Sequence, residues 1–103
     1  MGNIVRGTTP LIRYTFSNVD PTDISVAYLV LTQGRRDMVV KTLHDCTVGE
    51  NYIEWVLTQE DTLSLSERQP CQICLDWLLT DGTRGVGRTA QVGVSSSAID
   101  EAI

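Results

Sequence analysis

Polar and apolar residues alternate along three segments of this chain: residues 11–16, 52–58 and 71–79. Because successive side chains of a strand point to opposite faces, each segment is predicted to be a strand with one buried face. The side chains expected to point inward are Ile12, Tyr14 and Phe16 in the first segment, Ile53, Trp55 and Leu57 in the second, and Cys71, Ile73, Leu75, Trp77 and Leu79 in the third.

Three further segments are predicted to be strands with less regular patterns. Residues 25–32 and 37–43 are rich in β-branched residues, but they are apolar at both odd and even positions, so their buried faces stay open. A last strand is expected over residues 85–94, where glycines indicate weakness or bulges. Its apolar side would carry Val86, Ala90, Val92 and Val94.

Turn residues divide the chain between these strands. Gly34 stands first in a two-residue loop, which is typical of a type II′ turn and predicts a hairpin between residues 25–32 and 37–43. Asp81-Gly82 is typical of a type I′ turn and would pair residues 71–79 with residues 85–94. Pro21 indicates another turn, over residues 20–23.

Helical signals are few. Thr58 and Asp61 resemble a capping box, which predicts one helical turn over residues 59–65. Ser97 and Asp100 repeat this spacing near the end of the chain, where a short helix would need to dock on something or fray. Together these patterns predict an all-β protein, an antiparallel β-sandwich of about six to seven strands with one short helical turn. The sandwich would span residues 1–94, and residues 95–103 would form a flexible or docking tail.

Composition and charge narrow the function. With 42% hydrophobic residues, 103 residues are enough for a single folded domain. The formal net charge of −5 argues against nucleic acid as a partner, because a phosphate-binding surface is basic. No apolar run has the length of a membrane-spanning helix, and no secretory signal is recognisable, so we expect no membrane partner and synthesis in a cytoplasm.

Candidate catalytic and metal sites are weak. Cys71 and Cys74 form a Cys-x-x-Cys motif, but positions i and i+3 of a strand project to opposite faces and cannot hold one ion. His44, Asp45 and Cys46 are consecutive, and neighbours in sequence seldom converge on one reacting atom. The glycines of residues 82–87 lack the Lys-Ser/Thr ending of a phosphate-binding loop. We therefore expect neither an enzyme nor a cofactor or metal site.

Aromatic residues suggest a second class of function. Trp55 and Trp77 could stack on a sugar, but each shares its side of the strand with aliphatic residues and is expected in the core. A module that binds glycans on a host surface would instead use Tyr28, Tyr52 and the loop of residues 43–51. Exposure of either tryptophan would favour this alternative.

The chain also resembles a known family. The resemblance covers residues 4 to about 85, with IVRGTTPLIRYTF at 4–16, VDPTDISVAYL at 19–29, YIEWVLTQEDTLSL at 52–65 and DGT at 81–83. It is similar to short proteins encoded in phages and prophages of Gram-positive gut bacteria, and to the amino-terminal immunoglobulin-like domain of phage baseplate upper proteins. It departs from antibody domains, whose Cys…Trp…Cys order is absent.

The resemblance implies an immunoglobulin-like β-sandwich and a non-enzymatic role as a structural or assembly component of a phage tail or baseplate. The expected partners are other phage structural proteins or a second copy of the chain, and the expected location is the bacterial cytoplasm and then the virion tail. An apolar set in the tail is the candidate interface: Ala98, Ile99, Ala102 and Ile103.

Overall fold

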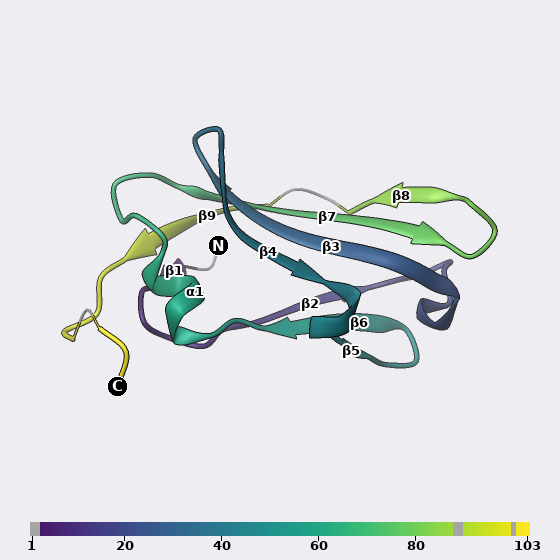
Figure 1. The fold of residues 1–103 in the computed structure, drawn as a ribbon, viewed down its shortest axis with the longest axis horizontal. Coiled ribbons are helices and arrows are strands. Elements are labelled where there is room, and N and C mark those ends of the chain that lie inside the picture. The colour runs from purple at the N-terminus through teal and green to yellow at the C-terminus, as the bar shows by residue number, and fades with distance from the viewer. Residues whose placement is uncertain (1–2, 88–89, 100) are drawn as a thin grey trace.

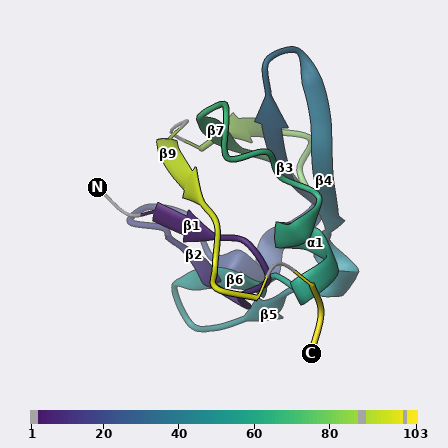
Figure 2. The ribbon, with the colours of Figure 1, turned by 90° about the vertical axis from the view of Figure 1, so that its left-hand side faces the viewer.

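The computed structural model describes residues 3–87, 90–99 and 101–103, which form two β-sheets and one short α-helix (Figure 1). The six-stranded sheet has the order β1-β9-β7-β3-β4, with β8 paired to β7, and the three-stranded sheet has the order β2-β6-β5. Figure 2 shows the two sheets as separate layers, with α1 at one side. The strands are β1 (Asn3–Val5), β2 (Leu11–Thr15), β3 (Ile24–Gln33), β4 (Arg36–Thr42), β5 (Thr47–Val48), β6 (Tyr52–Val56), β7 (Cys71–Leu79), β8 (Arg84–Val86) and β9 (Ala90–Ser95).

The prediction of a wholly antiparallel sandwich of six to seven strands is wrong in two respects. The described residues contain nine strands, and β1 pairs with β9 in parallel, with Ile4 opposite Val94. The chain then crosses from β1 in the larger sheet to β2 in the smaller one. Short strands such as β1 and β5 are too brief to show an alternating pattern in sequence.

The three alternating segments form β2, β6 and β7, and their predicted inward faces are confirmed. Ile53 and Trp55 of β6, Leu57 directly after it and Cys71 of β7 are fully buried, and Phe16 and Leu75 are only 6% and 5% exposed. The remaining inward residues, among them Ile12, Ile73 and Leu79, pack partly buried against this core.

Aromatic rings join the two layers. Tyr14 lies in β2 and Phe16 directly after it, and the ring centroid of Trp77 from β7 lies 5.5 Å and 5.1 Å from theirs. Trp55 lies in the core and donates its indole N–H to the carbonyl oxygen of Thr42 at 2.9 Å. Both tryptophans therefore serve packing between the sheets.

The sequence left open which face of residues 25–32 is buried, and the structure decides it. Ala27, Leu29 and Leu31 of β3 are fully buried, whereas Val26 and Tyr28 are exposed on the outer side of the sheet. A shift of register against β7 between Ile24 and Val26 lets Ile24 also point inward.

Both predicted hairpins are present, but one turn differs from the prediction. Gly34 has φ +63°, and β3 and β4 pair up to Gln33 and Arg36, as a type II′ loop requires. In the β7–β8 hairpin, Leu79 donates to the Thr83 carbonyl at 2.8 Å, so the loop has three residues rather than two. Gly82 alone has positive φ there, and a type I′ turn would need Asp81 to share it.

The predicted strand over residues 85–94 is divided. β8 and β9 both pair with β7, but the register differs by one residue between the Asp76–Val86 pair and the Ile73–Ala90 pair. Val86 therefore points outward with Asp76, while Val92 and Val94 face the core side. Val86 and the other members of the predicted apolar side do not share one face. Residues 88–89 lie outside the described part of the chain.

The helical predictions have opposite outcomes. The capping box is confirmed, because Thr58 accepts from the Asp61 N–H at 3.1 Å and Asp61 accepts from the Thr58 N–H at 2.9 Å, although α1 (Gln59–Leu63) ends before Leu65. The turn at Pro21 is confirmed as a 3-10 helix (Pro21–Asp23), and a second one covers Leu43–Asp45.

The predicted tail helix is wrong for the described residues of 96–103, which are irregular. The Gln59 side-chain amide instead binds Ile103 twice: its Oε1 accepts the Ile103 N–H at 2.7 Å, and its Nε2 donates to the Ile103 oxygen at 3.2 Å. A single helical turn does not repay its nucleation cost without packing. Asp100 lies outside the described residues.

Candidate functional site

The outer face of the larger sheet carries exposed apolar side chains from strands far apart in sequence. The pairing of the strands aligns these side chains, together with two charged ones, in rows across the sheet. Val26, Leu78 and Arg84 form the first row, Tyr28, Asp76 and Val86 form the second, and Val30 and Val40 form the third. We call these eight residues the outer patch. Val86 is 64% exposed and Tyr28 46% exposed, and Val26, Val40 and Leu78 are also exposed.

One ion pair crosses the outer patch. Nη2 of Arg84 lies 3.0 Å from Oδ2 of Asp76, and the two side chains are 70% and 40% exposed. The pair joins adjacent strands on a diagonal, because Arg84 is opposite Leu78 and Asp76 is opposite Val86. Since both groups remain in contact with water, the pair adds little to stability and can exchange partners at small cost.

Two shallow depressions flank Tyr28. One, of about 290 Å³, is lined by Val26, Tyr28, Asp76, Trp77, Leu78 and Arg84. The other, of about 270 Å³, is lined by Ser25, Val26, Ala27, Tyr28, Thr42, Leu43 and His44. Both walls are more apolar than polar, so this surface favours contact with apolar groups.

The candidate glycan-binding residues are brought together only in part. Tyr28, Leu43 and His44 line the same depression. Tyr52 lies on the outer face of the smaller sheet, where the guanidinium of Arg13 is 4.1 Å from its ring centroid. Trp55 is 1% exposed, and Trp77 is partly buried in the aromatic cluster.

The three consecutive candidate catalytic residues, His44, Asp45 and Cys46, have separate roles. Asp45 accepts the Thr42 N–H at 2.9 Å, which lowers the pKa of its carboxyl group. Cys46 donates its thiol to the Leu43 carbonyl at 3.1 Å, and burial raises its pKa. His44 is exposed beside Tyr28. They do not converge on a common point.

The Cys-x-x-Cys motif lies within a strand, as predicted. Cys71 is fully buried, and burial raises the pKa of its thiol to about 11, so it is neutral near pH 7. No disulfide involves Cys46, Cys71 or Cys74. Within residues 3–87, 90–99 and 101–103, no group of three or more histidine, cysteine or acidic side chains is arranged to hold a metal ion.

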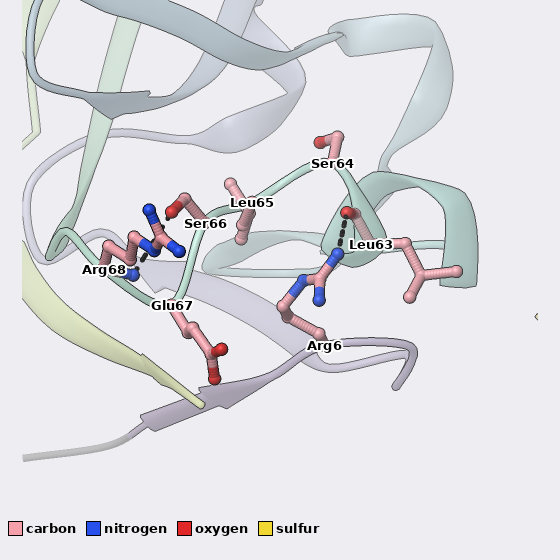
Figure 3. A pocket seen from close by; sticks show the side chains of 7 residues that line it. All are labelled: Arg6, Leu63, Ser64, Leu65, Ser66, Glu67 and Arg68. Carbon is pink, nitrogen blue, oxygen red and sulfur yellow. Dashed lines mark hydrogen bonds between the residues drawn. The ribbon is translucent and has the colours of Figure 1, made fainter. Parts of the chain in front are cut away.

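A third depression, of about 320 Å³, lies between the end of β1 and the segment after α1 (Figure 3). Arg6 points toward this segment and donates to the Leu63 carbonyl at 2.9 Å. Nearby, the buried amide of Gln33 donates to the Ser66 carbonyl at 2.6 Å and accepts the Ser66 N–H at 2.7 Å. These bonds hold the loop between α1 and β7 against the larger sheet.

The tail set is exposed but does not form a continuous helical face. Ala98, Ile99, Ala102 and Ile103 are all accessible to solvent. Across the described part of the chain, no helix is both long and apolar enough to span a membrane.

Most of the outer patch was missed by sequence reasoning, which singled out Tyr28 alone. The available signal was the second apolar side of residues 25–32 and 37–43. A strand that faces water on one side is expected to be polar there, so apolar residues on both sides indicate a second contact.

No protein-family model matches this chain, and no curated protein matches it either.

Proposed function

We propose that this chain is a non-enzymatic protein–protein interaction module of the phage tail or baseplate type, and that it binds through the outer patch. The observation that carries the proposal is the concentration of exposed apolar residues on one sheet face, with Val26, Tyr28, Val40, Leu78 and Val86 accessible together. Contiguous apolar patches are uncommon on monomeric proteins and mark interaction sites. The phage assignment rests on the sequence resemblance.

We also propose that the fold is immunoglobulin-like, and the order of the strands supports this. If β2, β3, β5, β6, β7 and β9 are taken as strands B, C, D, E, F and G, the smaller sheet has the order B-E-D and the larger contains G-F-C. β4 extends the larger sheet beside β3, as an additional C′ strand does in variable-type domains. Such a fold hosts many functions, so the argument for binding rests on the outer patch.

Binding to purified tail and baseplate proteins of a phage from a Gram-positive host tests the proposal. The immobilised chain is compared with Val86→Lys in the outer patch and Val56→Lys on the opposite sheet, where Val56 is 60% exposed. We expect Val86→Lys to weaken binding by about tenfold or more, because it places a charge in an apolar contact, and Val56→Lys to leave it unchanged. Equal effects of the two substitutions, or binding neither to these proteins nor to itself, would refute the proposal.

A glycan-binding module is the second candidate function, favoured by the exposed ring of Tyr28 between two depressions. Asp76 and Arg84 on one side and His44 on the other could hydrogen-bond sugar hydroxyl groups. An array of cell-surface polysaccharides from Gram-positive bacteria tests it. Binding lost in Tyr28→Ala but kept in Tyr52→Ala would establish this function, and an array without signal would remove it.

A further inference from the structure

We propose that the outer patch binds a second copy of this chain, face to face across a two-fold axis, with the Asp76–Arg84 ion pair exchanged between the copies. This inference rests on the proposed protein–protein function and names the partner. It is carried by the arrangement of apolar and charged residues in the outer patch.

Charge is the first argument for a second copy. The chain has a formal net charge of −5, but the outer patch holds one carboxylate and one guanidinium and is neutral. A basic or acidic partner would gain nothing from a neutral surface. A surface with one acid and one base side by side is complementary to itself, because a two-fold axis places the acid of each copy near the base of the other.

Register shows how the two copies can meet. A two-fold axis crossing the strands between the first and second rows places each row over the other row of the second copy. Tyr28 then lies over Val26 of the second copy. Asp76 lies over Leu78 of the second copy, one strand spacing of about 4.8 Å from the column of Arg84. The long and exposed Arg84 side chain can cover that distance.

The apolar rows supply the remaining contact. Two sheets that pack face to face keep their strands roughly aligned and about 10 Å apart, with side chains filling the space between. The exposed side chains of Val26, Tyr28, Leu78 and Val86 would fill it here, and the depressions beside Tyr28 provide room for its ring. The outer face of β3 would then be buried as its apolar composition requires.

The size of the surface predicts a weak dimer. The two rows that lie over each other span three strands, β8, β7 and β3, which gives a width of about 15 Å and a height of about 14 Å. This area is smaller than that of stable specific interfaces and lies in the range of weak, transient ones. The dimer should therefore dissociate on dilution.

Sedimentation equilibrium of the full chain from about 1 μM to about 1 mM tests the first part of the proposal. We expect a reversible monomer–dimer equilibrium whose dissociation constant rises about tenfold or more in Val86→Lys and is unchanged in Val56→Lys. A wild-type chain that is monomeric throughout overturns the inference, as does a dimer equally sensitive to both substitutions. Neither result alone decides whether the patch binds phage proteins, which the tail-protein experiment measures separately.

A charge exchange tests the two-fold register. Asp76→Arg and Arg84→Asp should each weaken self-association about tenfold or more, because like charges meet twice in either dimer. Mixing the two variants should restore dimers, since each contact then joins an arginine to an aspartate. Glu54→Arg, in the Arg13–Glu54 pair of the other sheet, is the matched control and should leave the self-association of the folded chain unchanged.

Folding of each variant is checked by circular dichroism and by the dispersion of its amide NMR signals. The exchanged residues are exposed, so we expect both variants to fold. If the folded variants do not associate when mixed, the ion-pair exchange is wrong.

Discussion

The outer faces of the two sheets each carry an arginine–carboxylate pair across neighbouring strands, but the surroundings differ. On the smaller sheet, Nε and Nη2 of Arg13 lie 2.8 Å and 2.7 Å from Oε2 of Glu54, whose side chain is only 17% exposed. The same guanidinium covers the ring of Tyr52. On the larger sheet, the Asp76–Arg84 pair is more exposed and lies among apolar residues.

The two faces also differ in how many apolar side chains they expose: that of the smaller sheet exposes one cross-strand pair, Leu11 and Val56, whereas the outer patch exposes five such residues. Arg13 satisfies Glu54 and shields Tyr52 at once, so the polar centre of the smaller face has its partners locally. The outer patch instead leaves its apolar rows in contact with water, an arrangement that becomes favourable when another surface covers it. The same kind of cross-strand pair therefore stabilises the smaller face, whereas on the larger sheet it leaves the surrounding apolar surface available for binding.

The largest effect is expected beneath the outer patch, where β7 faces the core. Leu75→Asp would place an unpaired carboxylate among buried residues and cost about 4 kcal/mol or more, enough to unfold a small domain. Gln72→Asp, on the exposed side of the same strand, should leave the fold intact. Circular dichroism and thermal unfolding measure both, and the reverse outcome would show that the assigned faces of β7 are wrong.

A smaller effect is expected at Gly85 on the inner side of β8. A Cβ atom there would lie 2.3 Å from the Trp77 ring, so Gly85→Ala must displace the aromatic cluster. We expect the free energy of unfolding to fall by about 1–3 kcal/mol. Val86→Ala, next to it but on the outer patch, should change it by less than about 0.5 kcal/mol. Urea unfolding of dilute protein compares the two, and equal losses would contradict the difference between the faces of β8.

Unfolding at low pH tests the ion pair between β4 of the larger sheet and α1, the helix that follows the smaller sheet. Nζ of Lys41 in β4 lies 2.8 Å from Oδ2 of Asp61 in α1. Burial raises the pKa of Asp61, but hydrogen bonds from Lys41 and Thr58 outweigh it and lower the pKa below 3.8. The folded chain thus releases this proton more readily than the unfolded chain, so the stabilisation is present above the unfolded pKa and is lost as pH falls through the lowered value.

Asp61→Asn should therefore cost about 1 kcal/mol near pH 7, and the difference from wild type should shrink as pH falls below about 4. Urea unfolding at several pH values measures this. A difference that stays constant down to about pH 2 would show that the charge of Asp61 does not contribute.

The smallest effects distinguish the two ion pairs themselves. In double-mutant cycles on dilute monomer, we expect the Arg13–Glu54 coupling to be about 0.5–1 kcal/mol and the Asp76–Arg84 coupling to be less than about 0.3 kcal/mol. The first carboxylate is mostly buried and bonded by two guanidinium nitrogens, whereas the second pair is solvated. A stronger coupling for Asp76–Arg84 would mean that this pair stabilises the monomer.

Local pattern predicted the strands whose two sides differ clearly in polarity. β2, β6 and β7 have alternating residues, and their inner faces were correctly predicted, as were the Gly34 hairpin and the capping box of Thr58 and Asp61. Each of these features depends on residues within one turn or one strand. The prediction of a type I′ turn at Asp81-Gly82 was wrong, because Asp81 keeps a negative φ in the longer loop.

The candidate site was less predictable because its members are distant in sequence. Val26, Val40, Leu78 and Val86 become neighbours only through the pairing of β4, β3, β7 and β8. The outward position of Val86 also depends on the one-residue change of register between β8 and β9. A single-residue change reverses which side of a strand faces the core, and no local pattern in residues 85–94 reveals it.

By itself, the sequence determined that this protein is rich in strands, where its clearest strands and turns lie, and which side of those strands is buried. Only the tertiary structure decided the parallel pairing of β1 with β9, the buried side of β3, and the assembly of the outer patch. The physical reason is that burial of an apolar side chain depends on what lies opposite it. When both sides of a strand are apolar, as in β3, packing of the other sheet selects one side for the core and leaves the other at the surface.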